Sequence, residues 1–445
     1  MMPARPRLAN SASLRISYLF PQFPTQTEVF AVSDIAALRR QGHEIAVHTI
    51  KPRRSDEDAR LRLAGVPGDI AIRRPRLAGA LRWPALLWKH RRPVASLLRR
   101  ITVHAGSTPA TAISALLSLP RIVEIADEVA AFDADIVHVF WSRHAGMVLP
   151  VLAGSGSRAL RSTFVGAYDL IADDFLVAIA FAWSELAFTH AATNRAYLEA
   201  NAPAGVPIKV IHRGIPLMAR DDSIARDPDL WLTASALAPA KNVQAVLHAF
   251  AEARGEQPQL RLEICGDGQD RARLEQVCRD LGCSEAVTFR GHIGREELFR
   301  HMQRASVFLL LSRKPAERLP NVIKEALWAG CAIVSSHSEG IEELLPDSRI
   351  GRIVDPDDRN AVTTAIRAAM SEADGAAQER QERSRNLISG QFSADSSMRG
   401  YVDAWRSTLA SRAAAGAPGA AVATAWPQAS ATTPLRQSQE MAQDG

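Results

Sequence analysis

The chain has 445 residues, of which 47% are hydrophobic and 23% are charged, and its formal net charge is +5. This length exceeds what one hydrophobic core organises, and the composition is that of an ordinary globular protein, so we expect two domains with appended segments. The four cysteines show no metal, redox or paired spacing, which excludes a disulfide framework and favours a reducing compartment.

The sequence does not predict an exported or membrane-spanning chain. The first apolar run, residues 16–20, is too short for the core of a signal peptide. The most apolar uncharged run, residues 101–120, mixes Gly, Pro, Ser and Thr with its apolar residues, which disfavours a membrane span. We therefore expect a cytoplasmic protein that reaches the membrane, if at all, as a peripheral protein on its inner face.

Strands and helices are predicted to alternate along the first half of the chain. A strand over 14–19, a helix over 29–41 that ends at Gly42, and a strand over 44–50 form a βαβ opening. Short apolar runs separated by helical stretches follow at 136–140, 159–164, 186–189 and 209–212. Such runs are typical of parallel strands covered on both faces. We predict a first Rossmann-like domain over residues 12–216.

This first domain carries a predicted basic insertion at about 70–123. No acidic residue occurs between Ile70 and Val123, where ten basic residues are interleaved with Leu and Trp. The basic residues are Arg73, Arg74, Arg76, Arg82, Lys89, Arg91, Arg92, Arg99, Arg100 and Arg121. The composition favours an anionic membrane surface. The alternatives are nucleic acid and a solvated insertion that packs on its own domain; we predict membrane contact and no nucleic acid.

After a polar connection over 215–228, the alternation restarts. Strands are predicted at 230–234, 259–265, 287–290, 307–311 and 332–335, and helices at 243–254, 270–281, 295–304, 321–329 and 361–372. This pattern predicts a second doubly wound domain over 217–390. A helix within 391–411 is expected to cross back to the first domain, and the tail 412–445 to be disordered. The predicted fold class is α/β, with two doubly wound parallel-sheet domains facing a central cleft that holds the ligand.

The segment from Glu317 to Glu325 is the part of the chain closest to chemistry. Its two carboxylates stand eight positions apart across the start of a predicted helix, which Asn321 can cap and Gly330 ends. A helix N-terminus suits a phosphate and carboxylates suit sugar hydroxyls, so a nucleotide sugar is the economical ligand. The alternative is an ordinary βα unit with two solvated acids.

Four motifs in the right order resemble the retaining glycosyltransferases of family four, in particular their exopolysaccharide and colanic-acid members. The family's architecture of two Rossmann-like domains is called GT-B. The motifs are a carboxylate, seven residues, a carboxylate and Ala-x-x-x-Gly (Glu317, Glu325, Ala326, Gly330), Gly-Asp-Gly (Gly266, Asp267, Gly268), Phe-x-Gly (Phe289, Gly291) and Lys-Asn (Lys241, Asn242). The resemblance covers about residues 14–411 and is most specific in the second domain. It implies that the first domain, 12–216, lies on the acceptor side and that the second, 217–390, is the nucleotide-sugar donor domain.

The resemblance implies roles for residues of the second domain. Glu325 would bind the ribose, Glu317 would lie by the transferred sugar, and Lys241 would contact the diphosphate. Taken alone, Lys241 is more simply a surface lysine, and the glycines a tight turn. The other donor-site candidates are Gly266, Asp267, Gly268, Asn321 and Arg318.

In the first domain, residues 23–30 resemble a Phe-Pro-x-x-Ser-Glu-Thr-Phe loop of the family, and residues 164–170 resemble its His-Gly-x-Asp segment. The resemblance implies that Glu28 faces the acceptor and that Asp169 orients a group in the cleft. Glu28 otherwise satisfies N–H groups at a helix start. His138, at the end of a predicted strand, is either a cleft residue that contacts substrate or a packed core histidine.

Three positions depart from the family pattern. Ala236 stands where the family has an arginine that shares the diphosphate, Val165 replaces a histidine, and Arg318 stands where many members have glycine. Loss of one charge-assisted contact at a developing charge costs on the order of 3 kcal/mol in the transition state. We expect Arg313, Lys314 or Arg318 to supply the missing charge.

The predicted function is a retaining glycosyltransferase that moves a hexose from a nucleoside-diphosphate sugar to a lipid-linked or saccharide acceptor, in polysaccharide or exopolysaccharide biosynthesis. Fixed charges and a dry cleft would stabilise the departing diphosphate, with no metal and no other cofactor. The alternatives are a non-hydrolysing nucleotide-sugar epimerase and a catalytically silent nucleotide-sugar binder. The second is suggested by Ala236 and Val165.

Overall fold

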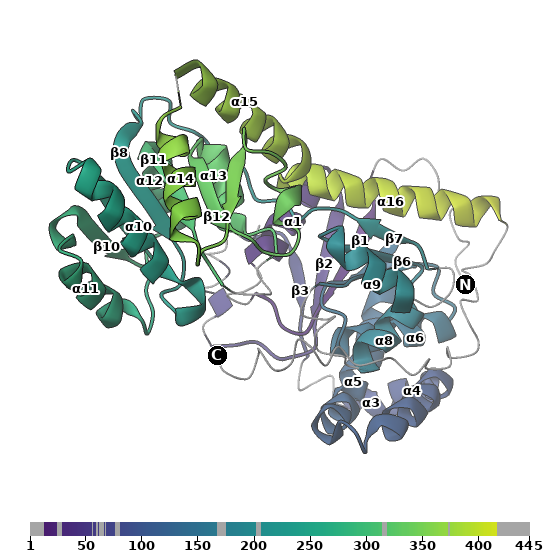
Figure 1. The fold of residues 1–445 in the computed structure, drawn as a ribbon. Helices are drawn as coiled ribbons and strands as arrows, with labels where there is room; N and C mark the ends of the chain where they lie inside the picture. Colours follow the sequence, from purple (N-terminus) through teal and green to yellow (C-terminus); the bar gives the residue numbers. More distant parts are fainter. Residues whose placement is uncertain are drawn as a thin grey trace. The chain divides into compact units, whose positions relative to one another are not determined.

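The computed structural model describes residues 13–24, 29–55, 57–58, 61, 66, 68–75, 81–166, 175–201, 206–313, 318–372 and 374–415. Its chain divides into two compact units, the first running to Arg213 and resuming at Ser397, the second running from Gly214 to Ser396. Each unit is built on a parallel sheet flanked by helices (Figure 1). Glu28, Asp169, Glu317 and residues 416–445 of the predicted tail lie outside the described residues.

The first unit contains a seven-stranded parallel sheet in the order β3-β2-β1-β4-β5-β6-β7. Its strands are β1 Arg15–Phe20, β2 Glu44–Thr49, β3 Ala71–Arg73, β4 Ile136–Val139, β5 Leu160–Phe164, β6 Leu186–Thr189 and β7 Ile208–Val210. Its helices are α1 Val29–Arg40, α3 Trp83–Lys89, α4 Arg91–His104, α5 Pro109–Phe132, the 3₁₀ turn η3 His144–Met147, α6 Val148–Gly154, α8 Phe175–Ala182 and α9 Thr193–Asn201. The βαβ opening and the predicted strands are confirmed, but β7, at the edge of the sheet, is only partly buried.

The long helix α16, Ala394–Ala414, covers one face of this first sheet with its part from Ser397 onward. Side chains alternate across a strand, so Val137 and Val139 of β4 pack in the cluster that contains α5, while His138 between them meets α16. Trp405 of α16 is fully buried, and its Nε1 donates a hydrogen bond to Ser162 Oγ at 3.0 Å. The last helix that the structure describes therefore supplies part of the core of the first unit.

The second unit contains a six-stranded parallel sheet in the order β10-β9-β8-β11-β12-β13. Its strands are β8 Asp227–Ala234, β9 Arg261–Cys265, β10 Val287–Gly291, β11 Ala305–Leu310, β12 Ala332–Ser336 and β13 Gly351–Val354. The chain runs outward from β8 to β10 and then returns to the other side of β8 at β11. This reversal is the topological switch point of a doubly wound sheet. The predicted fold class, two parallel-sheet Rossmann-like domains, is confirmed.

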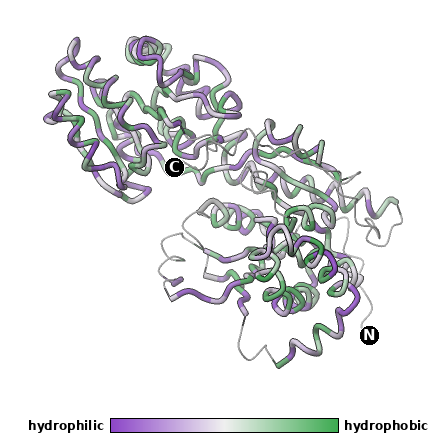
Figure 2. Tube along the Cα trace, turned by 60° about the horizontal axis from the view of Figure 1, so that its bottom comes forward, coloured by the Kyte–Doolittle hydropathy of each residue, from purple (hydrophilic) through white to green (hydrophobic). Residues whose placement is uncertain are grey.

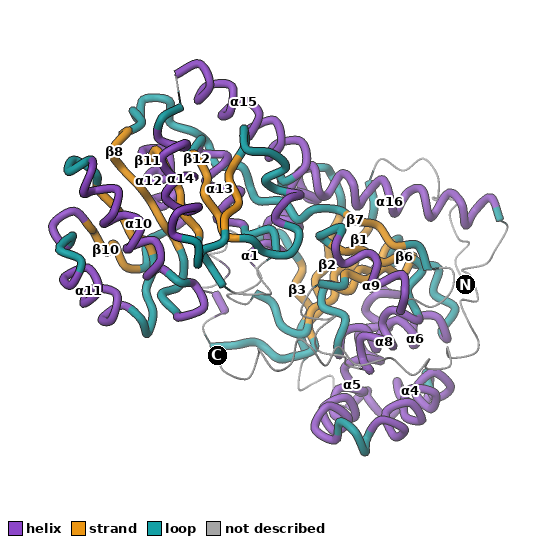
Figure 3. The backbone as a smooth tube through the Cα atoms, viewed as in Figure 1, coloured by secondary structure: helices purple, strands orange, loops and turns teal. Residues whose placement is uncertain are grey.

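Helices flank this second sheet on both faces (Figure 3). They are α10 Val243–Glu256, α11 Arg271–Asp280, α12 Arg295–Arg304, α13 Asn321–Ala329, α14 Arg359–Met370 and α15 Asp374–Gln391, with 3₁₀ turns η4 Pro239–Lys241, η5 Ser284–Ala286 and η6 Ile341–Glu343. Helix α10 packs against α11 and α14, whereas α13 packs against α12 and α15, as right-handed crossovers on either side of the switch point require. In Figure 2 the outer helices and loops of this unit are largely purple, and its central strands are largely green.

The predicted basic insertion folds into β3 and the helices α3, α4 and α5, and part of its charge is internal. Arg121 is buried, its Nη1 donating to Glu128 Oε1 at 2.8 Å and its Nε to the carbonyl of Thr49 at 2.9 Å. Arg73 Nη1 donates to the carbonyl of Glu128 at 2.9 Å. The interpretation that counted Arg121 toward a membrane surface was wrong, because a carboxylate of α5 and backbone carbonyls hold this arginine inside the unit, and Arg73 is half-buried beside it.

Helix α5 is also, within the described residues, the one helix whose length and composition meet the requirements of a membrane span. Its most apolar window is 44% buried inside the unit, and buried core helices meet the same requirements. The helix also contains Pro120. A single helix of this kind is weak evidence for a span.

Candidate functional site

The loops after β8, β9 and β10 meet at the carboxyl edge of the second sheet. Leu237 N–H donates to the carbonyl of Asp267 at 3.0 Å, and Gly266 N–H donates to the carbonyl of Gly291 at 2.7 Å. The Gly-Asp-Gly and Phe-x-Gly motifs, separated in sequence, are thus hydrogen-bonded neighbours. They form one continuous loop surface beside the switch point.

Lys241 lies in the η4 turn, on the same edge. The turn is tied to the loop after β11, because Arg313 N–H and Ser312 Oγ donate to the carbonyl of Ala240 at 2.8 and 3.2 Å. Asn242 follows with φ 49° and ψ 39°, in the left-handed region that asparagine tolerates. The loops on both sides of the switch point therefore position Lys241, where an α/β sheet ordinarily binds its ligand.

The two glycines of the Gly-Asp-Gly motif are required by close backbone approach. A Cβ on Gly266, whose φ is +133°, would lie 1.9 Å from the carbonyl oxygen of Ser235, and one on Gly268 would lie 2.3 Å from that of Leu237. Asp267 between them accepts hydrogen bonds from Gly268 N–H at 2.8 Å and from Arg271 Nη1 at 3.3 Å. These residues stabilise the loop surface through contacts within the protein, independently of any ligand.

Glu325 is held by Arg295, which was missed from the sequence. Nε and Nη2 of Arg295 donate to the same oxygen, Oε1 of Glu325, at 3.0 and 2.6 Å. The Glu325 side chain is 15% exposed and that of Arg295 is 35% exposed. Arg295 begins α12, four residues after Gly291 of the Phe-x-Gly motif, and this position on the site edge is the signal that would have found it. Glu325 keeps its second carboxylate oxygen for another partner.

The segment that enters α13 departs from the expected cap. The helix begins at Asn321 itself, with Pro320 in the N-cap position, and no side chain caps it; the prediction that Asn321 caps the helix was wrong. Asn321 Oδ1 instead accepts from Lys324 Nζ at 3.1 Å. Gly330, with φ 95°, ends the helix as predicted. Leu319 has φ 50°, a conformation that costs a residue with a Cβ about 1–2 kcal/mol.

Arg318, which precedes this turn, pairs through Nη2 with Glu339 of the loop after β12. Burial lowers the pKa of its guanidinium from the ordinary value. The pairing joins the loop after β11 to the loop after β12, so Arg318 has a structural role whether or not it also meets a phosphate. The preceding residue Glu317, like Glu28 and Asp169, lies outside the described residues, and the roles of those three remain predictions.

In the first unit, His138 is packed rather than open to solvent. Its Nδ1 lies 2.9 Å from Ser162 Oγ, and its ring meets Tyr401 and Trp405 edge-on at centroid distances of 5.5 and 5.6 Å. Burial, with a smaller contribution from the charge of Arg213, lowers the pKa of His138 to about 3. This environment supports the alternative of a packed core histidine.

The other first-unit position singled out from the sequence, Val165, is also buried. It lies 1% exposed in an apolar cluster with Phe181, Ala187 and Leu198. A histidine is therefore replaced here by a side chain that packs in the core.

Two doubly wound parallel sheets in one chain define the GT-B fold of glycosyltransferases. The solved structure of Anabaena HepE in complex with UDP shares this fold, with a TM-score of 0.62 and 16% identity over 88% of this chain and 100% of that one. Residues 218–387, which carry every loop of the candidate site, match the family described as Glycosyl transferases group 1. The second unit is therefore a glycosyl transferases group 1 domain.

Two curated relatives match parts of the chain. One is the GDP-mannose-dependent alpha-(1-6)-phosphatidylinositol monomannoside mannosyltransferase of Mycolicibacterium smegmatis, 34% identical over 137 residues, 30% of this chain and 36% of that protein. The other is the lipopolysaccharide core biosynthesis glycosyltransferase LpsE of Rhizobium meliloti, 32% identical over 166 residues, 37% of this chain and 46% of that protein. The chain spans less than half the length of these relatives.

Proposed function

We propose that the protein is a retaining glycosyltransferase that moves a hexose from a nucleoside-diphosphate sugar to a lipid-linked or saccharide acceptor, in polysaccharide or exopolysaccharide biosynthesis. The observation that carries the proposal is the convergence of the motif loops on one edge of the second sheet, at its switch point. Open α/β sheets bind ligands in the crevice outside this edge. The match of residues 218–387 to the glycosyl transferases group 1 family supports the same reading.

The site residues suit the parts of such a donor. Glu325 has one carboxylate oxygen held by Arg295, and its other oxygen would accept hydrogen bonds from ribose hydroxyls. The diphosphate would meet Lys241 and the N-terminus of α13, where unpaired N–H groups and the helix dipole favour negative charge. Glu317 would lie by the sugar. As the bond between the anomeric carbon and the phosphate oxygen breaks, charge grows on the diphosphate, and these fixed groups stabilise it.

The relatives suggest the class of donor and acceptor to test. One relative is named for GDP-mannose and for a phosphatidylinositol mannoside, and HepE was solved with UDP. Both nucleotides share the ribose and the diphosphate, which are the parts that the described loops suit. Titration with both nucleotides distinguishes between the two bases.

A lipid-linked acceptor is favoured by the surface of α3, α4 and α5. In the described part of the chain, the large apolar side chains that are exposed all fall between positions 81 and 117; they are Leu81, Trp88, Leu98, Val103, Ile113, Leu116 and Leu117. Exposed Arg82, Lys89, Arg91, Arg92 and Arg99 stand among them. Apolar side chains flanked by cations are what a surface needs to enter the headgroup region of an anionic bilayer.

Calorimetric titration of the full chain with UDP, GDP and their sugars tests the donor site. We expect one nucleotide series to bind, Glu325→Ala to weaken that binding at least about tenfold, and the matched variant Glu296→Ala, an exposed carboxylate beside Arg295, to leave it unchanged. The donor that binds is then incubated with membrane lipid extract. Labelled sugar in the lipid fraction, with its anomeric configuration read by NMR, supports transfer with retention. Absence of nucleotide binding would refute the proposal.

A vesicle experiment tests the membrane surface separately. The full chain should sediment with phosphatidylglycerol vesicles and not with phosphatidylcholine vesicles, and added salt should reverse the binding. Trp88→Ala combined with Leu117→Ser should weaken it. Equal sedimentation with both kinds of vesicle would contradict an electrostatic docking surface.

A catalytically silent nucleotide-sugar binder is the second candidate, and the exposed Ala236 favours it, because the loop after β8 lacks the cation expected there. The two candidates differ in one result. A transferase should turn over donor, and Ala236→Arg should raise its rate by adding a cation at the departing diphosphate. A silent binder binds nucleotide sugar with no product before or after the substitution.

A further inference from the structure

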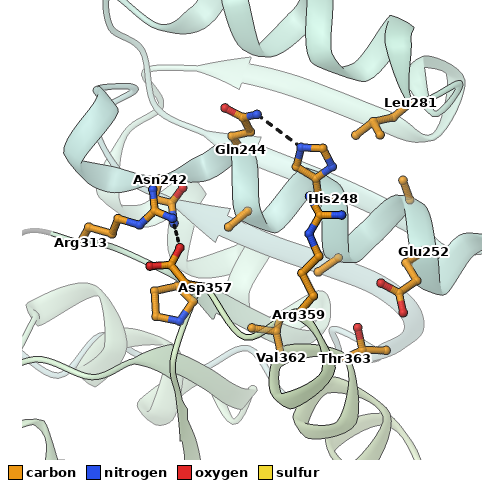
Figure 4. Close-up of a pocket in the computed structure, with 14 residues that line it drawn as sticks. Asn242, Gln244, His248, Glu252, Leu281, Arg313, Asp357, Arg359, Val362 and Thr363 are labelled. Atoms are coloured by element: carbon orange, nitrogen blue, oxygen red, sulfur yellow. Dashed lines mark hydrogen bonds and ion pairs between the residues drawn. The ribbon is translucent and has the colours of Figure 1, made fainter.

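A cavity of about 540 Å³ lies between α10 and α14, on one face of the second sheet (Figure 4). Its lining includes the buried Asn242 and Thr363 and the exposed Glu252 and Arg359. The volume is in the range of small-molecule sites, about 300–1,000 Å³. Of the motif residues in the described loops, the lining includes Asn242, which directly follows Lys241.

Two buried polar atoms at this cavity have no hydrogen-bond partner among the described residues. They are Nδ2 of Asn242 and Oγ1 of Thr363, in residues that are 8% and 6% exposed. Asn242 occupies the N-cap position of α10 and yet makes no side-chain cap, and the Thr363 hydroxyl makes no bond to the preceding turn of α14. Buried polar groups are nearly always satisfied, so a polar occupant toward which these two side chains rotate would supply hydrogen bonds that the free chain lacks.

The hydrogen bonds around His248 make its free ring nitrogen a donor. Arg273 Nη1 donates to Gln244 Oε1 at 2.5 Å, which fixes the orientation of the amide, and Gln244 Nε2 then donates to His248 Nε2 at 3.3 Å. The proton of the neutral ring is therefore on Nδ1. Burial and the charge of Arg359 lower the pKa of His248, which keeps the ring neutral near pH 7.

The charged residues at the cavity are distributed unevenly. Arg313 and Asp357 pair with each other at one side of it, as Figure 4 shows. Arg359, the first residue of α14, and Glu252, on α10, make no ion pair with any residue that the structure describes. An anionic group would pair with Arg359, and hydroxyl groups would pair with Glu252.

We propose that this cavity binds a small hydroxylated anion of the sugar phosphate class. Its phosphate would lie at Arg359 and His248, and its hydroxyls at Asn242, Thr363 and Glu252. These five residues offer a cation, three neutral donors and a carboxylate, which match one charged and several hydroxyl groups. The binding site itself is independent of the proposed transferase activity.

The cavity is coupled to the donor site through the η4 turn. Asn242 closes this turn, donating its N–H to the carbonyl of Pro239 at 3.0 Å, and the preceding carbonyl of Ala240 accepts from Arg313. An occupant that bonds Asn242 would restrain the backbone of Lys241. This regulatory consequence rests on the proposed function, and by linkage the donor would alter the affinity of the cavity by the same factor.

Calorimetric titration of the full chain with glucose 6-phosphate, mannose 6-phosphate, inorganic phosphate and glucose tests the proposal. A hexose phosphate should bind at least about tenfold more tightly than phosphate or glucose alone. Arg359→Ala should weaken it about tenfold, whereas Arg367→Ala, which on the same helix pairs with Glu256, should not. Thr363→Val should weaken binding and leave thermal stability unchanged or higher, a combination that a purely structural hydroxyl would not give.

Three results would overturn the proposal. They are the absence of hexose phosphate binding at millimolar concentration, equal affinity for inorganic phosphate, and an Arg359→Ala variant that binds as the parent does. Glu325→Ala and saturating UDP distinguish this cavity from the donor site, because neither should abolish the binding. If the chain binds no nucleotide, the proposed function fails while the hexose phosphate titration still decides the fate of the cavity proposal.

Discussion

Arg295 is expected to set the affinity of the donor domain for nucleoside diphosphates through Glu325. Two charge-assisted hydrogen bonds, at 3.0 and 2.6 Å, fix the carboxylate in the free protein. Hydrogen bonds to charged groups contribute about 1.5–3 kcal/mol, and the 35% exposure of Arg295 reduces this through solvent screening. Fixing a glutamate side chain otherwise costs up to about 2 kcal/mol of rotamer freedom on binding. Arg295→Ala should therefore weaken nucleotide binding by about 1–2 kcal/mol, or roughly five- to thirtyfold.

The assay is calorimetric titration with whichever of UDP and GDP binds and with its 2′,3′-dideoxy analogue. The analogue has no ribose hydroxyls, so Arg295→Ala should weaken the parent nucleotide and leave the analogue nearly unchanged. Arg300→Ala, exposed on the same helix, is the matched control. Equal losses for both nucleotides would mean that Arg295 touches the phosphate or supports the fold. Unchanged or tighter binding of the parent nucleotide would refute the reasoning outright.

Three further predictions concern the scaffold. Gly266→Ala, whose Cβ would meet Ser235 O at 1.9 Å, should abolish nucleotide binding and lower the stability measured by urea unfolding. Gly255→Ala, with nothing within 4 Å of its Cβ, should be neutral or up to about 1 kcal/mol stabilising, so similar urea unfolding curves for the two variants would contradict the reasoning. Trp405→Ala should cost about 3–5 kcal/mol in the free energy of unfolding and Trp405→Phe clearly less, so a loss below about 1 kcal/mol for alanine would show that α16 is dispensable. Folded His138 stays neutral while the unfolded histidine protonates below its ordinary pKa of 6.5, so the free energy of unfolding should fall by up to about 1.4 kcal/mol per pH unit as the pH drops from 6.5 to about 3. In urea titrations at several pH values, His138→Phe should show a shallower dependence of this free energy on pH, and an identical dependence would exclude the histidine as its source.

The elements that could be predicted from the sequence are those whose burial is written in a local pattern. Strand β11 has five of its six residues buried, and a parallel strand covered on both faces reads as an apolar run. The missed strands β3 and β13 lie at sheet edges, are three and four residues long, and contain Arg73 and Arg352, which edge positions tolerate. Helix α15 was missed because its sequence is polar; tertiary contacts such as Arg380 Nη1 to the carbonyl of Cys331, at 2.8 Å, hold it.

The candidate site could be predicted from the sequence only in part, because some of its residues are recognised by residue type and others only by contacts that the fold creates. Gly266 and Gly268 could be found because their constraint is a backbone conformation, which the residue type itself records. The pairing of Arg295 with Glu325 could not be predicted, because the two residues are thirty positions apart and are brought together by the packing of α12 on α13. The burial of Arg121 could not be predicted from the sequence for the same reason. Charge counted along a sequence does not tell which side chains the fold turns inward.

The first unit is begun first but completed last, because α16, which covers its sheet, follows every strand of both sheets in the chain. A ribosome delivers His138 and Phe188 long before Tyr401 and Trp405, the α16 residues whose rings cover them. The second unit has all its strands before α16 emerges, so it can finish folding while the nascent first unit still exposes an aromatic face. Release of a chain that stops short of Ser397 would leave that face open to aggregation or chaperone capture, although every strand of both sheets had been made.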